Sequence, residues 1–238
     1  GENSVIDFDA RAERILDAAE DLLVNHGYER TSGEEITRRA GVGAGTLYLH
    51  WKRLELLFHT VILREVVRVH QEQIRLIRRD PREALLHRFT RANFMIVTGR
   101  PLANALTTAD GELLGRLAVA RPSVDYRTTS RQVTTRHLDL LRGNGLLRAD
   151  VDRDTQAYTL DAATSGFLRV RDAAAVTAPP GRAQRADLLA ALVRRAFEPP
   201  DEPDPRAVED VAHRLLAVVT EAAEAHEHNR RSLMLTRT

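Results

Sequence analysis

The sequence predicts an all-α protein in which a small N-terminal domain precedes a larger helical one. Aromatic residues make up only 5% of the 238 positions, while alanine, leucine, valine and arginine dominate. Apolar residues recur at three- and four-residue spacing, and no convincing strand pattern occurs. A short glycine-rich segment joins two short helical patterns within residues 31–58. These observations favour helices throughout and a helix-turn-helix near the start.

The first helix is expected over residues 9–25, because the apolar positions there follow one face of a helix. Those positions are Phe8, Ala12, Ile15, Ala19, Leu22 and Leu23. Gly27 should end this helix, and Tyr28 is expected to pack beneath the motif that follows. The three helices together would form a small N-terminal domain.

A capping box marks the start of the second helix. Ser32 is followed three residues later by Glu35, so the hydroxyl and the carboxylate can each bind a free amide of the first turn. The helix should therefore begin near Gly33 and end at Gly41, where φ > 0 closes a helix readily.

A third helix is expected from Ala44, with Leu47 and Trp51 on one face. Its first turn has almost no side-chain bulk, so its backbone and free amides can approach another surface and suit phosphate. Lys52 and Arg53 follow directly. Small side chains toward bases and cations toward the backbone are typical of a helix that reads DNA.

The charge distribution agrees with this interpretation although the net charge is only +1. Residues 1–37 hold 10 acidic and three basic side chains, a balance of −7. Residues 38–82 hold 10 basic and four acidic ones, a balance of +6. The basic stretch thus begins at the end of the first motif helix and continues along the next long helix.

Residues 11–60 closely resemble the DNA-binding domain of the TetR family of bacterial regulators. The resemblance is carried by residues 14–23, 26–28, 31–32, 36, 40–42, 45–48, 50–51 and 55–58. One departure concerns the end of the motif: many family members have a phosphate-contacting lysine where this chain has Leu54, and a proline-serine pair where it has Lys52 and Arg53. We therefore expect the cations to lie two positions upstream.

The motif and the resemblance together predict the DNA contacts. Ser32 and Gly33 should hold a phosphate, while Ala44 and Thr46 should meet thymine methyl groups. The full predicted DNA-binding set is Ser32, Gly33, Ala44, Gly45, Thr46, Tyr48, Leu49, His50, Lys52 and Arg53. Tyr48, His50, Lys52 and Arg53 are expected on the DNA backbone, and Tyr48 has packing between helices as an alternative role.

A long helix is predicted over residues 53–79, ending before Pro81. At 1.5 Å per residue it would span roughly 40 Å, long enough to link the small domain to the rest. Further helices are expected over residues 81–98, 102–108, 112–120, 122–142, a segment from Asp152 or Asp154 to 171, 184–197 and 206–228. Residues 176–183 and 199–205 should connect them. The predicted domains are residues 1–53, which bind DNA, and 54–238, which bind an effector and dimerise.

The last helix is so apolar that it needs a partner on more than one side. The resemblance implies a homodimer formed by C-terminal helices, and residues 154–171 and 206–228 are the candidates; burial within one subunit is the alternative. It also implies a small-molecule pocket between residues 81 and 171. Aromatic or polar side chains that could line it are Phe89, Asn93, Phe94, Met95, Tyr126, His137, Tyr158 and Phe167, for each of which an ordinary core role is the alternative.

Several kinds of chemistry have no support in the sequence. There is no cysteine, and the single lysine does not belong to a Walker loop. His226 and His228 lie two apart on a helix and face different sides, so we expect no metal site. No cofactor is expected. No apolar run approaches about 18 residues, which favours a cytoplasmic protein that does not enter a membrane.

These observations predict a non-enzymatic, sequence-specific transcriptional regulator. We expect a homodimer that binds double-stranded DNA at a palindromic operator and represses until an unidentified small-molecule effector releases it. The alternatives are a helical ligand-binding or scaffolding protein whose DNA-binding function has lapsed, and an enzyme that uses the central pocket.

Overall fold

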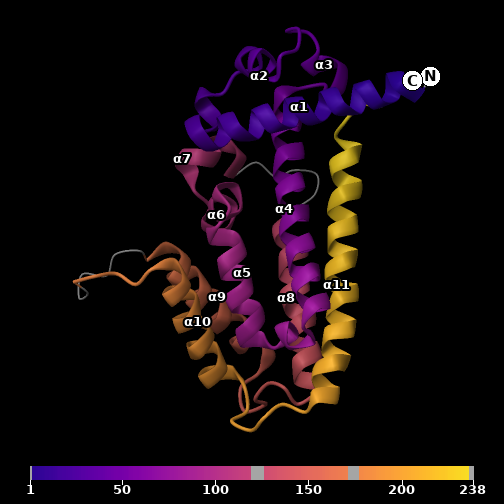
Figure 1. Cartoon of the computed structure of the whole chain (residues 1–238). Helices are drawn as coiled ribbons and strands as arrows, with labels where there is room; N and C mark the ends of the chain where they lie inside the picture. Colours follow the sequence, from indigo (N-terminus) through magenta and orange to yellow (C-terminus); the bar gives the residue numbers. More distant parts are fainter. Residues whose placement is uncertain (1, 119–125, 171–176, 236–238) are drawn as a thin grey trace. The chain divides into compact units, whose positions relative to one another are not determined.

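The computed structural model describes residues 2–118, 126–170 and 177–235, with side chains from Phe8 onward. These residues form helices and connecting segments, with no strand among them, so the all-α prediction is confirmed (Figure 1). The first helices are α1 (Glu2–His26), η1 (Tyr28–Arg30), α2 (Gly33–Ala40), α3 (Leu47–His50) and α4 (Leu54–Arg79). The next are η2 (Pro81–Ala84), α5 (Leu86–Thr98), α6 (Pro101–Thr108), α7 (Gly111–Leu114) and η3 (Gly115–Ala118). The last are α8 (Tyr126–Gly143), α9 (Arg153–Arg169), α10 (Arg182–Phe197) and α11 (Pro205–Ser232).

The chain divides into two compact units. Unit 1 contains Gly1–Val67, Ala105–Asp125 and Glu224–Thr238, and unit 2 contains Arg68–Asn104 and Tyr126–Ala223. Helices α4, α6 and α11 therefore each contribute residues to both units. The predicted functional division at residue 53 is a different one and stays a prediction.

Unit 1 is built around α1, which packs against α2, α3 and α7. Its apolar face is buried as the three- and four-residue spacing predicts. Tyr28 meets the edge of the Phe58 ring at a centroid distance of 5.1 Å, so it lies inside this unit as expected. Leu47 and Trp51 are fully buried on one side of α3.

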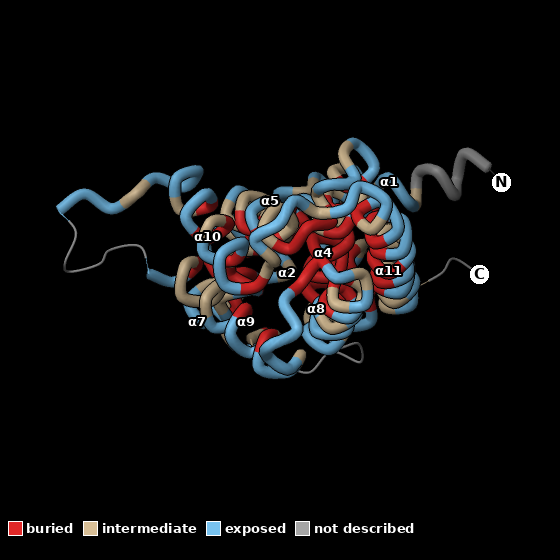
Figure 2. Tube along the Cα trace, turned by 90° about the horizontal axis from the view of Figure 1, so that it is seen from below, coloured by how far each residue is buried: buried red, intermediate tan, exposed pale blue. Residues whose placement is uncertain are grey.

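Unit 2 has one continuous core to which α5, α8, α9, α10 and α11 contribute. Helix α5 packs chiefly against α10. The broad apolar face of α11 is buried within its own chain, including Val211, Leu215 and Val219. Figure 2 shows this buried side in red and the exposed side of the same helix in pale blue. Burial within the subunit, the alternative for this helix, is therefore what the structure shows.

Several helix boundaries differ from the prediction. Helix α3 begins at Leu47 instead of Ala44, because the preceding residues form turns in which Thr46 N donates to Gly43 O and Leu49 N to Thr46 O. Two glycines in four residues disfavour a helix there. The segment predicted as one helix over 81–98 is divided at Leu85, whose extended backbone separates η2 from α5.

The remaining differences are at helix ends. Of the helix predicted over 112–120, the described residues belong to α7 and η3, which are divided at Gly115, where φ is 50°. Residues 119 and 120 lie outside the described residues. Asp152 caps α9, which ends at Arg169. Helices α1, α6, α10 and α11 extend beyond their predicted ranges, whereas α4 and α8 begin within theirs. Pro122 and Arg171, the predicted first and last residues of two helices, lie outside the described residues.

Candidate nucleic-acid interface

Helix α2 is fixed at both ends by the residues that the sequence marks. The Ser32 hydroxyl accepts a hydrogen bond from the Glu35 amide at 3.2 Å. Gly41 closes the helix with φ of 67°, and the Val42 amide donates to the Thr37 carbonyl at 3.0 Å. The Ser32 side chain remains exposed, so the start of α2 faces solvent.

The turn between α2 and α3 is open on its outer side. A side-chain carbon added at Gly45 would meet nothing within 4 Å. Ala44 is exposed, and Tyr48 and Leu49 are 55% and 59% exposed. Exposed apolar side chains beside a bare backbone offer a surface that another macromolecule can approach closely.

Tyr48 connects this turn to α2. A carbon at Gly33 would lie 3.7 Å from the Tyr48 hydroxyl, which places that hydroxyl beside the first turn of α2. The free amides of that turn and the hydroxyl thus face one region of the surface. Leu54 also lies here, with Cδ1 3.9 Å from the same carbon position, and provides an apolar neighbour in place of the lysine of many family members.

Lys52 and Arg53 follow directly after the end of α3. Both are exposed, and no acidic side chain of the described residues lies within ion-pairing distance of either. The preceding residue, Trp51, anchors this segment to α4, because its indole donates a hydrogen bond to the Thr60 hydroxyl at 2.9 Å. We call this region the α2–α3 surface; its residues are Ser32, Gly33, Ala44, Gly45, Thr46, Tyr48, Leu49, Lys52 and Arg53.

His50 differs from the other predicted contacts, because its side chain is buried. The ring lies 4.0 Å from the Phe8 ring between centroids and has no hydrogen-bond partner within the described part of the chain. Burial, with a smaller contribution from Arg11, lowers the pKa of His50. The predicted phosphate contact of His50 is therefore corrected: this neutral ring packs α3 onto α1.

The structure also contains a support that the sequence analysis missed. Arg64 of α4 is buried and binds three carboxylates of α1, those of Glu13, Asp17 and Glu20, at 3.0, 2.8 and 2.5 Å. The three acids lie four and three residues apart, which places them on one face of α1. That spacing was visible in the sequence, but the arginine that they bind lies 44 to 51 residues away.

The predicted ligand-lining residues all lie in unit 2 but do not form one site. Phe89 and His137 meet edge to face at 4.8 Å, and Asn93 accepts from Gln73 at 2.9 Å. Phe94 is buried in the core, whereas Tyr158 is 76% exposed. Met95 and Phe167 pack against the core from its edge, and Tyr126 is partly exposed.

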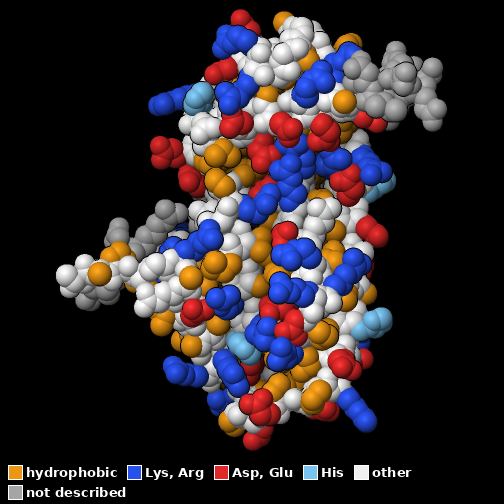
Figure 3. Space-filling model, in the orientation of Figure 1, with side chains coloured by type: hydrophobic (Ala, Val, Ile, Leu, Met, Phe, Trp, Pro, Cys, Tyr) orange, Lys and Arg blue, Asp and Glu red, His pale blue; other side chains and the backbone are white. Residues whose placement is uncertain are grey.

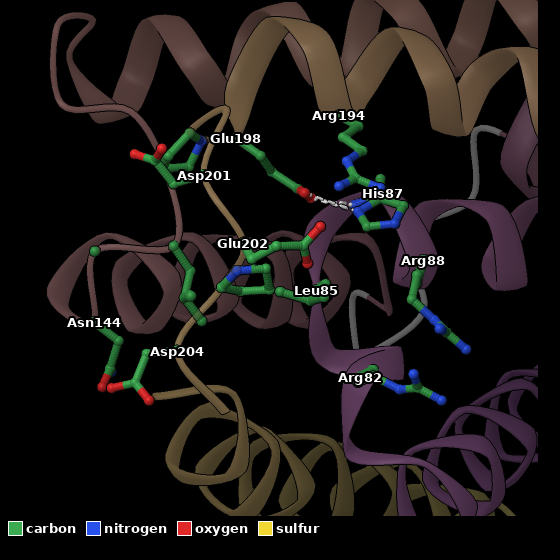
Figure 4. A pocket seen from close by; sticks show the side chains of 14 residues that line it. Arg82, Leu85, His87, Arg88, Asn144, Arg194, Glu198, Asp201, Glu202 and Asp204 are labelled. Carbon is green, nitrogen blue, oxygen red and sulfur yellow. Dashed lines mark hydrogen bonds and ion pairs between the residues drawn. The ribbon is translucent and has the colours of Figure 1, made fainter. Parts of the chain in front are cut away.

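Neither of two cavities found in unit 2 is lined by any of those eight residues. One, of about 350 Å³, lies among the start of α5, the turn after α8 and the connector between α10 and α11 (Figure 4). In it Glu198 accepts from the His87 amide and lies 2.8 Å from His87 Nδ1, with Arg194 beside them. The other, of about 600 Å³, is an open groove between α8 and α11. No cluster of three or more metal-binding side chains is found among the residues that the structure describes.

The comparisons with known proteins agree with this geometry. A family model described as bacterial regulatory proteins, tetR family, matches residues 15–61, which include the whole α2–α3 surface. CprB from Streptomyces coelicolor, solved with its biological operator sequence, is 25% identical; the match covers 87% of this chain and 97% of that one, with a TM-score of 0.54. No curated protein matches the sequence.

Two further solved structures share the fold. SmeT, the repressor of the Stenotrophomonas maltophilia efflux pump SmeDEF, has 23% identity and a TM-score of 0.57, covering 82% of this chain and 97% of its own. A gamma-butyrolactone receptor described as ArpA-like has 22% identity and a TM-score of 0.56, covering 92% and 99%. No helix among the described residues is long and apolar enough to cross a membrane. Residues 15–61 thus match the tetR family of bacterial regulatory proteins, and the chain as a whole shares the fold of the TetR family protein CprB.

Proposed function

We propose that this protein is a transcriptional repressor that binds a palindromic operator as a homodimer and releases it when a small-molecule effector binds. The observation that carries the proposal is the α2–α3 surface, where exposed small and apolar residues lie beside Lys52 and Arg53, two cations with no acidic partner among the described residues. In the similar CprB structure, the bound molecule is that protein's operator. We further propose a cytoplasmic protein without catalytic activity, in which residues 1–53 bind DNA and residues 54–238 bind the effector and dimerise.

Each part of the α2–α3 surface has a proposed role. Ser32 and Gly33 hold a phosphate through the hydroxyl and free amides at the start of α2. The bare turn lets the backbone approach the bases, so that Ala44 and Thr46 meet base edges, with Gly45 between them and Leu49 on the same surface. Tyr48, Lys52 and Arg53 bind the DNA backbone, which fixes the register but carries little sequence information.

The dimer is proposed to form through α9 and α10. Within the described part of unit 2, every exposed large apolar side chain lies on or next to these two helices: Val151, Tyr158, Val170, Leu188 and Leu192. Helix α11 has none, since its apolar face is used inside the subunit. Exposed apolar residues that gather on neighbouring helices are typical of subunit interfaces. We therefore propose α10, in place of the predicted residues 206–228, as the helix that forms the interface together with α9.

Release is proposed to pass through α4. This helix is continuous from unit 1 into unit 2, so a ligand that repacks unit 2 can displace the start of α4 next to α3. The two α3 helices of a dimer must lie roughly 34 Å apart to enter successive major grooves. An effector acts only through its different affinities for the DNA-bound and free states. Of the eight predicted ligand-lining residues, those other than Tyr158, which is assigned to the dimer interface, remain proposed contacts of the effector, although they do not line one cavity.

The test is fluorescence anisotropy of the purified protein on its own upstream intergenic DNA and on scrambled DNA, at several salt concentrations. A specific regulator should prefer one palindromic segment by about 10³-fold or more. Compounds that bind should then lower this affinity. Equally weak binding to that segment and to other genomic fragments would contradict the proposal.

A further inference from the structure

The C-terminal end of α11 belongs to the same compact unit as the α2–α3 surface. Residues 224–235 pack in unit 1 together with α1, α2 and α3, although α11 begins in unit 2. His226 within this segment is completely buried. The last turn bends the chain, since the Leu233 amide donates to Arg230 O and the Met234 amide to Arg231 O.

This bend brings the chain to α3. The Leu235 amide donates a hydrogen bond of 2.7 Å to the carbonyl of His50, the last residue of α3. Carbonyl groups at the end of a helix have no partner within it and need one from elsewhere. The His50 ring is meanwhile packed against Phe8. The end of α3 is therefore held through its side chain by α1 and through its backbone by the C-terminal segment.

A second contact joins the same segment to α1. One oxygen of Glu13 lies 3.5 Å from Arg230 of α11, and the other accepts from Arg64 of α4 at 3.0 Å. The Arg230 side chain is only 14% exposed and also binds Glu227 at 2.8 and 2.9 Å. Glu13 thus lies between two arginines from the two long helices that continue into unit 2. Arg231, the residue after Arg230, has a side chain that is 75% exposed and pairs with Glu227 of the same helix.

We propose that residues 224–235 are a C-terminal brace that positions α3 and α1 for DNA binding, through the Leu235–His50 and Arg230–Glu13 contacts. This inference rests on the proposed DNA-binding function and adds residues that lie about 170 positions beyond the matched domain. It makes α11, besides α4, a second helix through which a change in unit 2 reaches the DNA-binding residues.

Truncation of the full chain tests the brace. A chain ending at Ser232 lacks the Leu235 amide, whereas a control chain ending at Leu235 retains it. Trp51, the only tryptophan, is buried next to His50 and reports on α3 without DNA. Acrylamide should quench Trp51 more strongly in the chain that ends at Ser232, and its operator Kd should rise about tenfold, the effect of one lost hydrogen bond and looser packing. The control should match the full chain in both measurements.

A pair of point variants gives the same test with α11 at full length. Arg230→Gln removes the contact with Glu13, and Arg231→Gln removes an equal charge from the next residue. Arg230→Gln should raise the quenching of Trp51 and weaken operator binding by several-fold more than Arg231→Gln. Unchanged Trp51 quenching in both the shorter chain and Arg230→Gln would overturn the brace. If the full chain itself prefers no DNA, the proposed function fails and the Trp51 measurement alone decides on the brace.

Discussion

Two pairs of basic residues, one pair in each unit, differ in their surroundings. In unit 2, Arg82 binds Asp80 and Arg148 binds Asp150, each through two or more hydrogen bonds. In unit 1, Lys52 and Arg53 stand exposed without an acidic partner among the described residues. A guanidinium that already binds a carboxylate must give it up to bind a phosphate, whereas a free cation exchanges only water and counterions. The availability of a cation, more than its presence, therefore marks a DNA surface. Figure 3 shows how closely basic and acidic side chains are interspersed on one face of the molecule.

Exposed apolar side chains give the same contrast. Tyr48 and Leu49 in unit 1 lie next to the free cations, whereas Leu188 and Leu192 in unit 2 lie on a helix whose neighbouring residues include none of the DNA-binding set. Apolar side chains beside a turn of small residues suit a nucleic acid, which can approach the backbone there, whereas apolar side chains that gather on neighbouring helices suit a protein interface. Four measurements can sharpen or break this contrast.

The largest effect is expected from Leu188→Glu with Leu192→Glu. Two carboxylates in an apolar interface should convert the dimer to a monomer at micromolar concentration, since each buried charge costs several kcal/mol. Sedimentation velocity measures the mass. Ala183→Glu is the matched control, because it adds charge about 140° around α10 from Leu188 and should leave the dimer intact. A dimer that survives the double substitution would place the interface on other helices.

The next effect concerns a histidine inside unit 2. His137 is buried, donates to the Ala84 carbonyl at 2.7 Å, and has its pKa lowered by burial to about 4. The folded state thus disfavours protonation, so the stability that neutral His137 provides is complete above about pH 6.5 and is lost as the pH falls toward 4. This amounts to about 3 kcal/mol over that window.

Urea unfolding at several pH values measures this loss. His137→Gln, which keeps a donor for Ala84, should flatten the dependence between pH 6.5 and 4. The exposed histidine of the same unit, His213, serves as the control, and His213→Gln should leave the dependence steep. His50, His59 and His70 also have pKa values lowered by burial, so part of the slope should remain. Identical slopes for the two variants would show that His137 is not the dominant group.

The free cations of unit 1 give the third effect. Lys52→Ala with Arg53→Ala should weaken operator binding about hundredfold or more and reduce the salt slope by about 3.6, because each protomer of the dimer loses two phosphate contacts. Arg148→Ala with Arg153→Ala removes the same charge from paired arginines and should change neither quantity appreciably. Anisotropy titrations at four salt concentrations measure both. Similar losses in the two double variants would mean that overall charge, and not availability, governs binding.

Much of the fold could be predicted from the sequence because local rules govern it. The spacing of apolar residues predicts the helices, the Ser32 cap predicts where α2 begins, and Gly41 predicts where it ends. These features depend on residues within one or two turns of each other.

What the sequence could not predict depends on contacts between distant residues. The sequence predicts His50 as a DNA contact because it lies in the helix that reads DNA, yet Phe8, 42 positions earlier, packs against its ring. The apolar face of α11 left open whether a second subunit or its own chain covers it. The α5 amide of His87 is capped by Glu198, 111 residues away, which no local pattern indicates.

The smallest effect separates two roles of Ser32, which caps α2 and is proposed to bind phosphate. Ser32→Ala removes the acceptor of the Glu35 amide and should lower the free energy of unfolding by about 1 kcal/mol, and it should also weaken DNA binding. Ser32→Asp keeps a good cap but places a carboxylate where a phosphate is proposed to bind. It should therefore retain stability in urea unfolding while losing more operator affinity than Ser32→Ala. If the aspartate variant binds the operator as well as the serine does, Ser32 acts only on the helix, and the phosphate lies elsewhere on the α2–α3 surface.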